Sequence, residues 1–489
     1  MYSPLEPKPW KPVQFICTTY PNGEGIVTNG EAGYHDLDSL AEIIGHLFDL
    51  KDKGFVIYSM YGGSLLVDAT ASKLWEIHYW NGRVSHYIFA GKITIYPMSG
   101  ISQNVESVWP FFTWLRENGI QAGSFTSMAA RTWQLSLNGT VSFFDEAGQG
   151  RNALYGSRKE AIRGKYRWMY YQDLRAAFPS TMANNSFPRR VKETNRLQIH
   201  ESGYALATVN IPSGLDWNPI PCRLGKRAVT YGFGQQTDWW TFEDLRHVLD
   251  FGGQVVIHRA FKGYNPQPIF RDWYDYIITP ARMSLEGDAQ LALKTLANRL
   301  WSSFAVGGTN KVARFEDSKR KRIVEKTTEL RGMRYESYIA CQVLALVRSR
   351  VLEALYTVKD PVYVDTDAII CSNRDDLGNG WRVKKRMATV EVHSCQNYKW
   401  ECPRCGVYTS PLCNGPHYSL AMPASNRFEA EIALGHIEMP VNPLFGITVN
   451  PDDLTTLRGK FGYKQPVHPG ADSIDWGSLR EGTQQRFTV

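Results

Sequence analysis

The sequence lacks the features that mark membrane, fibrous or disordered proteins. Its 489 residues contain no uninterrupted apolar run of about 18 residues, and its opening resembles neither a signal peptide nor a transit segment. It has no internal repeat or low-complexity tract, and 43% of its residues are hydrophobic and 21% charged. We therefore expect a folded cytoplasmic protein with no membrane partner.

Cysteine is scarce, with 8 residues in 489, which excludes a disulfide scaffold. Half of the cysteines form one cluster with a C-x-x-C knuckle at its centre: Cys395, Cys402, Cys405 and Cys413. This spacing favours a structural tetrahedral Zn²⁺ ion, with His393 and His417 as substitute ligands. The alternative is four reduced, partly buried cysteines without a metal.

Neither sign of charge dominates, since 55 Lys and Arg face 48 Asp and Glu, a net charge of +7. Such a balance suits a polyanionic partner without requiring one. The length predicts roughly three or four domains. The most charged stretch, residues 311–331, is typical of a solvated hairpin or helix face, with phosphate contact as the alternative.

Hydrophobic periodicity predicts an α/β (α+β) multidomain chain. A helix is expected at 37–50, and a longer one at 284–306 with an apolar face and a separate stripe of Lys294, Asn298 and Trp301. A third helix, at 335–355, is apolar nearly all round and should be buried against a sheet. Short strands are expected at 13–18, 55–59, 64–68, 84–89 and 93–96.

Two aspartates are predicted at the tip of a tight hairpin. A strand at 362–364 leads into Asp365 and Asp367, and a second strand, 368–371, follows. Paired carboxylates repel each other unless a cation neutralises them, and hard oxygen ligands suit Mg²⁺ or Mn²⁺. The alternative is an ordinary turn.

A third carboxylate, Asp173, ends another predicted strand, 168–172. We expect a helix to start at Pro179 and Ser180, so that residues 174–178 form a turn whose backbone N–H groups can cradle a triphosphate. Three carboxylates on adjacent strands would hold two metal ions for a phosphoryl transfer. The alternative for Asp173 is a neighbour that caps the helix.

Three segments resemble the motifs of family B DNA polymerases. D-L-R-A-A-F-P-S from Asp173 resembles motif A (D-x-x-S-L-Y-P-S), and K-T-L-A-N-R-L-W-S from Lys294 resembles motif B (K-x-x-x-N-S-x-Y-G). Y-V-D-T-D-A from Tyr363 resembles motif C (Y-G-D-T-D-S). The order is that of the family, and the spacing resembles the protein-primed branch of small bacteriophages and linear plasmids. The resemblance covers residues 120–400.

This resemblance implies a right-hand polymerase with palm, fingers and a small thumb, preceded by a ribonuclease H-like, exonuclease-like domain. The expected divisions are an exonuclease-like domain at 1–140, palm with motif A and an insertion at 141–255, fingers with motif B at 256–306, an insertion and palm with motif C at 307–394, and a thumb with the zinc module at 395–489.

The implied activity is template-directed addition of deoxynucleotides to a 3′ hydroxyl, with template-primer DNA and deoxynucleoside triphosphates as partners. Asp173 and Asp367 would ligate two Mg²⁺ or Mn²⁺ ions, and Asp365 would support them. Phe178 replaces the Tyr that blocks a 2′-hydroxyl in the family, so sugar discrimination should survive. The implied nucleotide-binding residues are Lys294, Asn298, Arg282, Leu174, Phe178 and Trp301, although Arg282 fits a simple surface arginine equally well.

Two further segments resemble parts of the family that contact DNA. L-Y-G-S-R from Leu154 resembles the Y-x-G-G/A segment that grips the template strand, with Leu in place of the first Tyr. Q-N-Y, ending at Tyr398, stands where a K-x-Y motif near the primer terminus would fall, with Gln in place of Lys. The implied DNA-binding residues are Tyr155, Gly156, Arg158 and Tyr398.

The amino-terminal third lacks the carboxylates of a proofreading exonuclease. F-I-C-T-T from Phe15 stands where D-x-E-T-T is expected in the family. Asp68 is the one acidic residue that could correspond to a carboxylate of the exonuclease site. One carboxylate cannot hold two Mg²⁺ ions. We therefore expect no 3′–5′ exonuclease activity.

Several alternatives stay open. The chain could be a catalytically silent, polymerase-like DNA-binding subunit of a replisome; a reverse transcriptase is disfavoured because Thr366 separates the two aspartates of the hairpin. Residues 185–265 and 307–332 are either insertions that seat a terminal protein and enclose the template, or ordinary loops. The priming mode is open, and the location would be the bacterial cytoplasm if the chain is phage-encoded.

Overall fold

The structure is a computed structural model of the chain. It divides into two units, Met1–Ser142 with Phe270–Tyr335 (unit 1) and Phe143–Ile269 with Glu336–Val489 (unit 2). No helix within the described ranges has the length and apolar character that a membrane crossing requires. The structure describes residues 3–4, 13–18, 25–28, 34–37, 56–61, 75–80, 83–89, 93–97, 105–120, 124–146, 148–161, 164–194, 201–212, 215–224, 228–231, 234–305, 309–317, 322–329, 336–374, 377–378, 380–392, 431–433 and 436–438.

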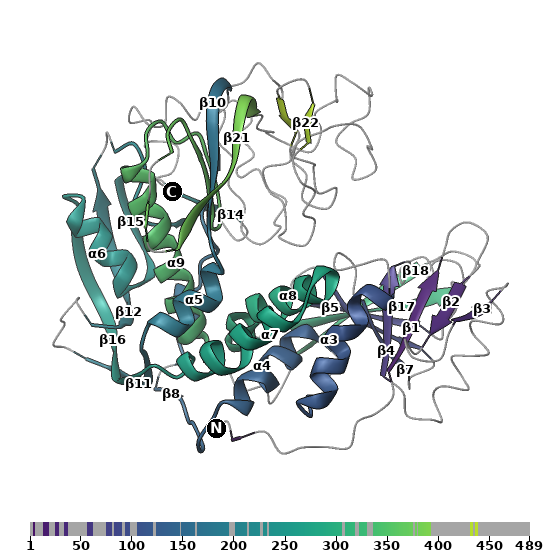
Figure 1. Ribbon diagram of the computed structural model, residues 1–489. Coiled ribbons are helices and arrows are strands. Elements are labelled where there is room, and N and C mark those ends of the chain that lie inside the picture. Colours follow the sequence, from purple (N-terminus) through teal and green to yellow (C-terminus); the bar gives the residue numbers. More distant parts are fainter. Residues whose placement is uncertain are drawn as a thin grey trace. The chain divides into compact units, whose positions relative to one another are not determined.

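Unit 1 contains a nine-stranded sheet whose strands lie in the order β18-β17-β5-β6-β7-β4-β1-β2-β3 (Figure 1). Strand β17 pairs with β5 in antiparallel fashion, so a late hairpin extends a sheet built from the first part of the chain. The strands are β1 (Val13–Thr18), β2 (Gly25–Thr28), β3 (Tyr34–Leu37), β4 (Val56–Tyr61), β5 (Trp75–Trp80), β6 (Arg83–Phe89), β7 (Ile93–Pro97), β17 (Thr309–Asp317) and β18 (Arg322–Glu329).

The helices of unit 1 pack on one another through aromatic residues. Trp133 lies 5.4 Å from both Phe270 and Phe304, measured between ring centroids, and all three side chains are buried. Such rings bury large apolar areas and pack edge to face. Within the described residues of this unit, the helices are α3 (Val105–Glu117), α4 (Phe125–Leu135), the π-helical turn η2 (Trp273–Ile278), α7 (Thr279–Ser284) and α8 (Gly287–Phe304).

Unit 2 contains two five-stranded sheets. The first, here named the aspartate sheet, has the order β21-β10-β20-β19-β9, and the second has the order β15-β12-β16-β11-β8. Two short pairs, β13-β14 and β22-β23, complete the strands. Their bounds are β8 (Phe144–Asp145), β9 (Lys159–Ala161), β10 (Gly164–Leu174), β11 (Phe187–Glu193), β12 (Gly203–Ile211), β13 (Cys222–Leu224), β14 (Ala228–Thr230), β15 (Gly234–Thr241), β16 (Gln254–Gln267), β19 (Tyr363–Asp365), β20 (Ala368–Cys371), β21 (Trp381–Val392), β22 (Glu431–Ala433) and β23 (His436–Glu438).

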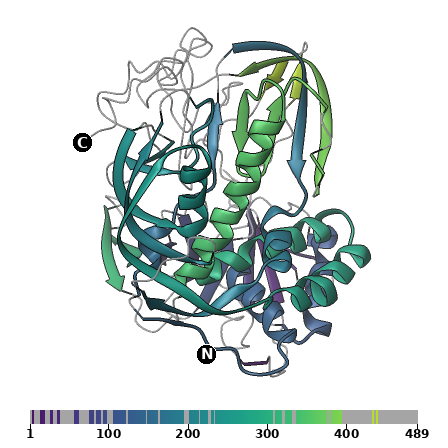
Figure 2. The same ribbon diagram turned by 90° about the vertical axis from the view of Figure 1, so that its left-hand side faces the viewer.

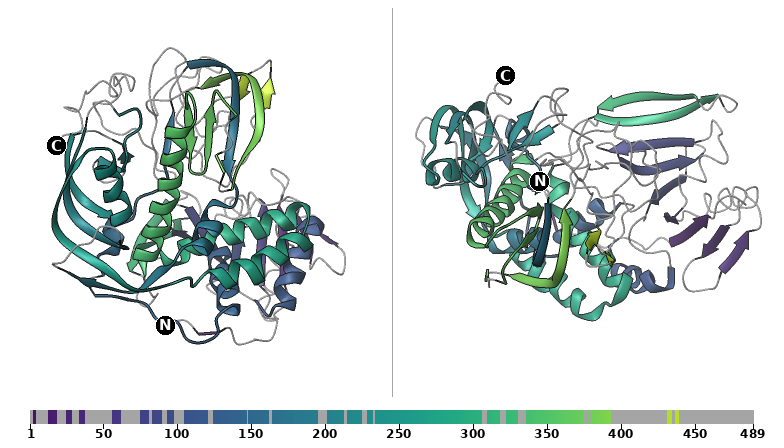
Figure 3. Two further views of the ribbon diagram at one scale, coloured as in Figure 1. Left: turned by 60° about the vertical axis from the view of Figure 1, so that its left-hand side comes forward. Right: turned by 90° about the horizontal axis from the view of Figure 1, so that it is seen from above.

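Helix α9 (Ser337–Thr357) lies between the two large sheets of unit 2 (Figures 2 and 3). Val351 and Leu355 pack with Ile369 of the aspartate sheet, and the helix also contacts the second sheet. A helix covered on both sides needs apolar residues nearly all round, which is the pattern of this segment. The other helical elements of unit 2 are η1 (Gly150–Ala153), α5 (Ala177–Asn184) and α6 (Phe242–Asp250).

Most of the predicted elements that fall on described residues are confirmed. The predicted strands at 13–18, 84–89 and 93–96 correspond to β1, β6 and β7, and the helices at 284–306 and 335–355 correspond to α8 and α9. The charged stretch forms the hairpin β17–β18 rather than a helix. Of the predicted helix 37–50, Leu37 is the last residue of β3 and the remainder lies outside the described residues, as does the predicted strand 64–68. The five-part domain division stays a prediction, because the two units are a coarser partition.

Candidate active site

Three predicted aspartates lie at one end of the aspartate sheet. Ala368 of β20 is the register partner of both Asp173 on β10 and Asp365 on β19. Asp367 precedes Ala368 at the hairpin tip, and its carbonyl oxygen accepts a 2.7 Å hydrogen bond from the N–H of Leu174. The backbone therefore brings motifs A and C together, as the sequence predicts.

The β19–β20 hairpin tip is fixed by local hydrogen bonds. Thr366 adopts a positive φ of 63°, and its hydroxyl donates to Oδ1 of Asp365 at 3.0 Å. The hydroxyl of buried Tyr363 donates to Oδ2 of Asp365 at 3.4 Å. Burial, and then the nearby Asp365 carboxylate, raises the pKa of Tyr363 above its usual range, so this hydroxyl stays a donor at neutral pH. Both oxygens of Asp365 thus already have protein partners.

Asp173 is paired with two cations that the sequence analysis did not single out. Nζ of Lys384 lies 2.9 Å from its Oδ1, and Nη2 of Arg382 lies 3.5 Å from its Oδ2. Arg382 is the register partner of Asp173 on β21. The basic run after Trp381 was visible in the sequence, but nothing in it revealed which carboxylate these cations would meet.

The turn after Asp173 differs from the prediction in two respects. Helix α5 begins at Ala177 rather than at Pro179, after Ala176 in the left-handed region with a φ of 49°. The N–H groups of Leu174 and Arg175 donate to the carbonyl oxygens of Asp367 and Gly380 at 2.7 and 2.9 Å. The prediction that they cradle a triphosphate is therefore wrong for these two groups, because neighbouring strands already use them.

Leu174 and Phe178 have different surroundings. Leu174 is fully buried in a small cluster with Ala177 and Val347, which holds α5 against α9. Phe178 is partly buried at the edge of the same cluster, together with Trp381. A partly buried ring close to Asp173 in the chain is compatible with the predicted contact with a sugar, and that role stays a prediction.

The segment predicted to grip template DNA is attached to the hairpin tip. The carbonyl of Arg158 accepts a 2.7 Å hydrogen bond from the N–H of Thr366, and the hydroxyls of Ser157 and Thr366 lie 2.9 Å apart. The Arg158 side chain is 1% exposed and donates to the carbonyl of Asn218 at 2.8 Å. Its guanidinium lies 4.2 Å from the centroid of the Tyr231 ring.

Tyr155 and Gly156 are also buried. The Tyr155 hydroxyl donates to Oδ2 of Asp238 at 2.8 Å. The backbone carbonyl oxygens of Tyr155 and Gly156 accept hydrogen bonds from Nη1 of Arg348 at 3.1 and 3.0 Å. The Tyr155 and Arg158 side chains thus face the interior of unit 2, which does not offer them directly to DNA. A DNA contact by this segment stays a prediction.

The predicted nucleotide contacts from motif B lie in unit 1, whereas the three aspartates lie in unit 2. On α8 the apolar face is confirmed, because Leu293, Leu300 and Phe304 are buried. Lys294 and Asn298 are half-buried one turn apart, and Trp301 is buried. Arg282, in the last turn of α7, is half-buried too.

Other predicted site residues lie outside the described part of the chain: Tyr398, the cysteines 395, 402, 405 and 413, and Asp68. Within the part that is described, no group of three or more His, Cys, Asp or Glu lies close enough to hold a metal ion.

Comparison with solved structures identifies the fold. The chain is similar to phi29 DNA polymerase in complex with primer-template DNA and incoming nucleotides, with a TM-score of 0.59 and 12% identity over 78% of this chain and 86% of that one. The chain has the fold of phi29 DNA polymerase. The binary complex with primer-template DNA gives a TM-score of 0.59 at 13% identity, covering 77% and 85% of the two chains, and the complex with single-stranded DNA gives 0.57 at 14%, covering 77% and 84%.

No protein-family model and no curated protein matches this sequence. At identities of 12% to 14% the similarity concerns the fold. It confirms the predicted polymerase fold with mixed α/β content and the resemblance to the protein-primed family B enzymes at that level. The chemistry has to be argued from the residues of this chain.

Proposed function

We propose that this chain is a template-directed DNA polymerase that adds deoxynucleotides to a 3′ hydroxyl. The observation that supports this most strongly is the convergence of Asp173, Asp365 and Asp367 at one end of the aspartate sheet. One of the similar structures is a complex with primer-template DNA and incoming nucleotide substrates, and we propose the same two partners here.

Asp173 and Asp367 would hold the metal. Their donors are carboxylate oxygens, and Mg²⁺ is commonly bound by one or two carboxylates, with substrate phosphates and water completing its shell. When bound, such ions lower the pKa of the attacking hydroxyl and neutralise charge on the phosphates. Asp365, whose oxygens accept hydrogen bonds from Tyr363 and Thr366, would hold the hairpin tip in shape.

Unit 1 would supply the nucleotide contacts. Lys294 and Asn298 are half-buried one turn apart on α8, where a point charge and an amide suit a triphosphate. We propose that Arg282 and Trp301 contribute to the same pocket and that Phe178 discriminates against a ribose. Replacing Phe178 with Ala should raise ribonucleotide incorporation relative to deoxynucleotide incorporation.

The cysteine cluster and the amino-terminal third carry further proposals. We propose that Cys395, Cys402, Cys405 and Cys413 bind one structural Zn²⁺, to be tested by the zinc content of the purified protein. We also propose that the chain has no 3′–5′ exonuclease activity, because β1 carries Phe15 and Cys17 where carboxylates are required. A terminal protein as primer is a further proposal, tested by comparing incorporation with and without one.

Primer extension tests the central proposal. Asp367→Ala should lower the rate by a factor of about 10³ or more, equivalent to about 4 kcal/mol of transition-state stabilisation. Asp216→Ala, which removes an exposed carboxylate from the same unit, is the matched control and should extend normally. The alternative is a catalytically silent DNA-binding subunit, favoured by the two cations on Asp173, and it predicts no difference between these variants.

A further inference from the structure

The two cations on Asp173 are unlike an ordinary surface ion pair. The Asp173 side chain is 8% exposed, whereas Lys384 is 30% exposed and Arg382 is 42% exposed. Each carboxylate oxygen has its own cationic partner, the closer being Lys384 at 2.9 Å. A buried carboxylate is therefore neutralised by side chains that reach it from the solvent side.

A β-bulge places Lys384 in this position. In the β10–β21 ladder, Tyr171 pairs with Lys385 and Gln172 pairs with Val383, so Lys384 is the extra residue on β21. Bulges re-aim side chains and are frequent beside active sites. The Nζ atom of Lys384 also lies 5.5 Å from the centroid of the Tyr171 ring, whose face attracts a cation.

Under the proposed function, Asp173 would also hold a divalent ion, although its Oδ1 already has Lys384 as a partner at 2.9 Å. Like charges repel at short distance, so the ammonium and a metal ion would compete for the Asp173 carboxylate. Once displaced, the partly exposed ammonium would return to water, and the triphosphate of a bound nucleotide would offer it a new anionic partner.

We propose that Lys384 competes with the divalent metal for Asp173 and thereby couples metal binding to triphosphate binding. Metal alone binds less well because it must first break the ion pair between Lys384 and Asp173. Metal together with nucleotide binds well because the triphosphate receives the displaced ammonium. Lys384 is thus a positioning residue, and by linkage metal and nucleotide strengthen each other's binding. The inference rests on the proposed function for the identity of the nucleotide.

Mn²⁺ titration of the full chain without DNA tests this coupling, with free Mn²⁺ read by electron paramagnetic resonance. Lys384→Gln should bind Mn²⁺ about five-fold or more tightly than wild type when no nucleotide is present. A non-hydrolysable deoxynucleotide should then improve Mn²⁺ affinity less in the variant than in wild type. Lys384→Arg should behave as wild type.

Two controls complete the experiment. Arg386→Gln removes a cation from the same strand whose guanidinium lies over the ring of Trp168, 5.1 Å from its centroid, and should leave Mn²⁺ affinity unchanged. Lys384→Gln combined with Asp173→Asn should lose the gain. Thermal unfolding checks that each variant is folded.

The inference is overturned if Lys384→Gln binds Mn²⁺ as wild type does or more weakly, or if the gain survives in the Asp173→Asn background. Primer extension separates this result from the proposed function. If the wild-type chain extends primers but Lys384→Gln shows no gain in Mn²⁺ affinity, only the role of Lys384 is refuted. If Lys384→Gln shows the gain but the wild-type chain does not extend primers, only the polymerase activity is refuted.

Discussion

Two aspartates of unit 2 are held by basic side chains in contrasting ways. Asp244 and Arg348 are each 3% exposed, and Nη2 of Arg348 lies 2.9 Å from both carboxylate oxygens. Asp173 is also buried, but its partners Lys384 and Arg382 are partly exposed, with one contact each. The first pair joins α9 to α6, and the second borders the candidate active site.

The difference shows which ion pair can be exchanged. Arg348 also donates to the carbonyls of Tyr155 and Gly156, so its removal would leave a buried carboxylate and two carbonyls without their donor. Lys384 and Arg382 can return to water when they leave Asp173. The Asp244–Arg348 pair therefore stabilises the fold, whereas the cations on Asp173 can be replaced by a ligand.

Arg348→Ala is expected to have the largest effect on folding. Removing one partner of a buried pair costs about 3–5 kcal/mol of unfolding free energy, because the other charge stays buried. Urea denaturation of the variant measures this loss. Arg386→Ala, a change on the partly exposed β21, should stay within about 0.5 kcal/mol of wild type. A loss below about 1 kcal/mol for Arg348→Ala would remove the contrast between the two pairs.

Tyr155→Phe tests the contribution of a single hydrogen bond in the segment whose carbonyls accept from Arg348. The variant loses the 2.8 Å bond to Asp238, and we expect about 1 kcal/mol less stability in urea denaturation. Thr208→Val removes a half-buried hydroxyl on β12 whose 2.7 Å hydrogen bonds with Thr237 and His258 are exposed to solvent, so it serves as the control and should change stability less. Equal effects in both variants would contradict a special role for the segment that contains Tyr155.

Lys384→Met should change stability by less than about 1 kcal/mol, because a partly exposed ion pair contributes little after solvent screening. The same holds for Arg382→Met. Chemical denaturation at low and high salt would check both values. A loss as large as that of Arg348→Ala would show that Asp173 cannot release its cations, and would argue against exchange at this site.

The stability of the α6–α9 contact, which contains the Asp244–Arg348 pair, should depend on pH through His247. Burial lowers the pKa of His247, against the opposing influence of Asp244, Glu353 and Asp250, and its Nε2 lies 2.8 Å from the Ser349 hydroxyl. The unfolded chain therefore binds the proton more readily, so stability is full above the ordinary His pKa of about 6.5 and falls as the pH drops below it. Urea midpoints at pH 7.5 and 5.5 should differ less in His247→Gln than in wild type.

The sequence predicts features that depend on neighbouring residues and on strong patterns. Asp365 and Asp367 were expected at a hairpin tip because apolar strand residues flank them on both sides. The apolar face of α8 follows from its spacing, and the buried α9 follows from its composition. Predicting each of these features requires only the local hydrophobic periodicity of the chain and the tendency of strands and helices to bury apolar side chains.

Features that depend on distant pairing were not predictable. The ion pair between Arg382 and Asp173 spans 209 residues and depends on the register and the bulge of β10 and β21. Arg158 looked like a DNA contact because a basic residue follows a family-like segment, but its surroundings are the aromatic rings of Trp217 and Tyr231. The backbone N–H groups of Leu174 and Arg175, which the sequence analysis assigns to a triphosphate, instead donate to the carbonyl oxygens of Asp367 and Gly380, far away in the chain.

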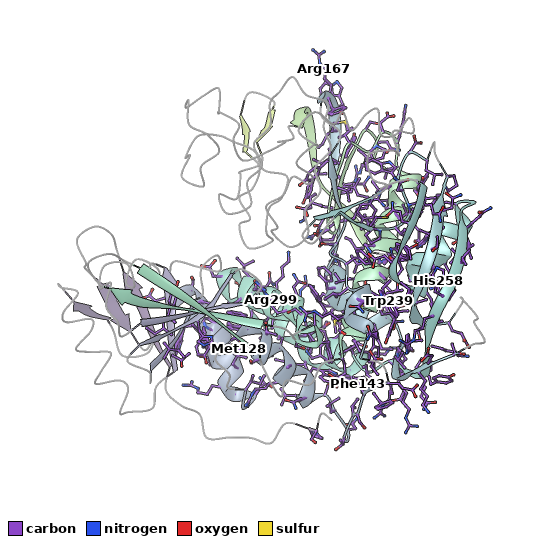
Figure 4. The ribbon with its side chains drawn as sticks, turned by 180° about the vertical axis from the view of Figure 1, so that it is seen from behind. Met128, Phe143, Arg167, Trp239, His258 and Arg299 are labelled. Carbon is purple, nitrogen blue, oxygen red and sulfur yellow. The ribbon has the colours of Figure 1, made fainter. Side chains whose placement is uncertain are left out.

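Within unit 2, strand β10 runs along β21 over nearly its whole length, and exposed Arg167 projects at its outer end (Figure 4). This pairing has a consequence for biosynthesis. When β10 leaves the ribosome, β20 and β21 have not been translated, and β5 of unit 1 likewise lacks its later neighbour β17. Each unit joins an early and a late stretch of the chain, so neither can close until translation has passed Glu336.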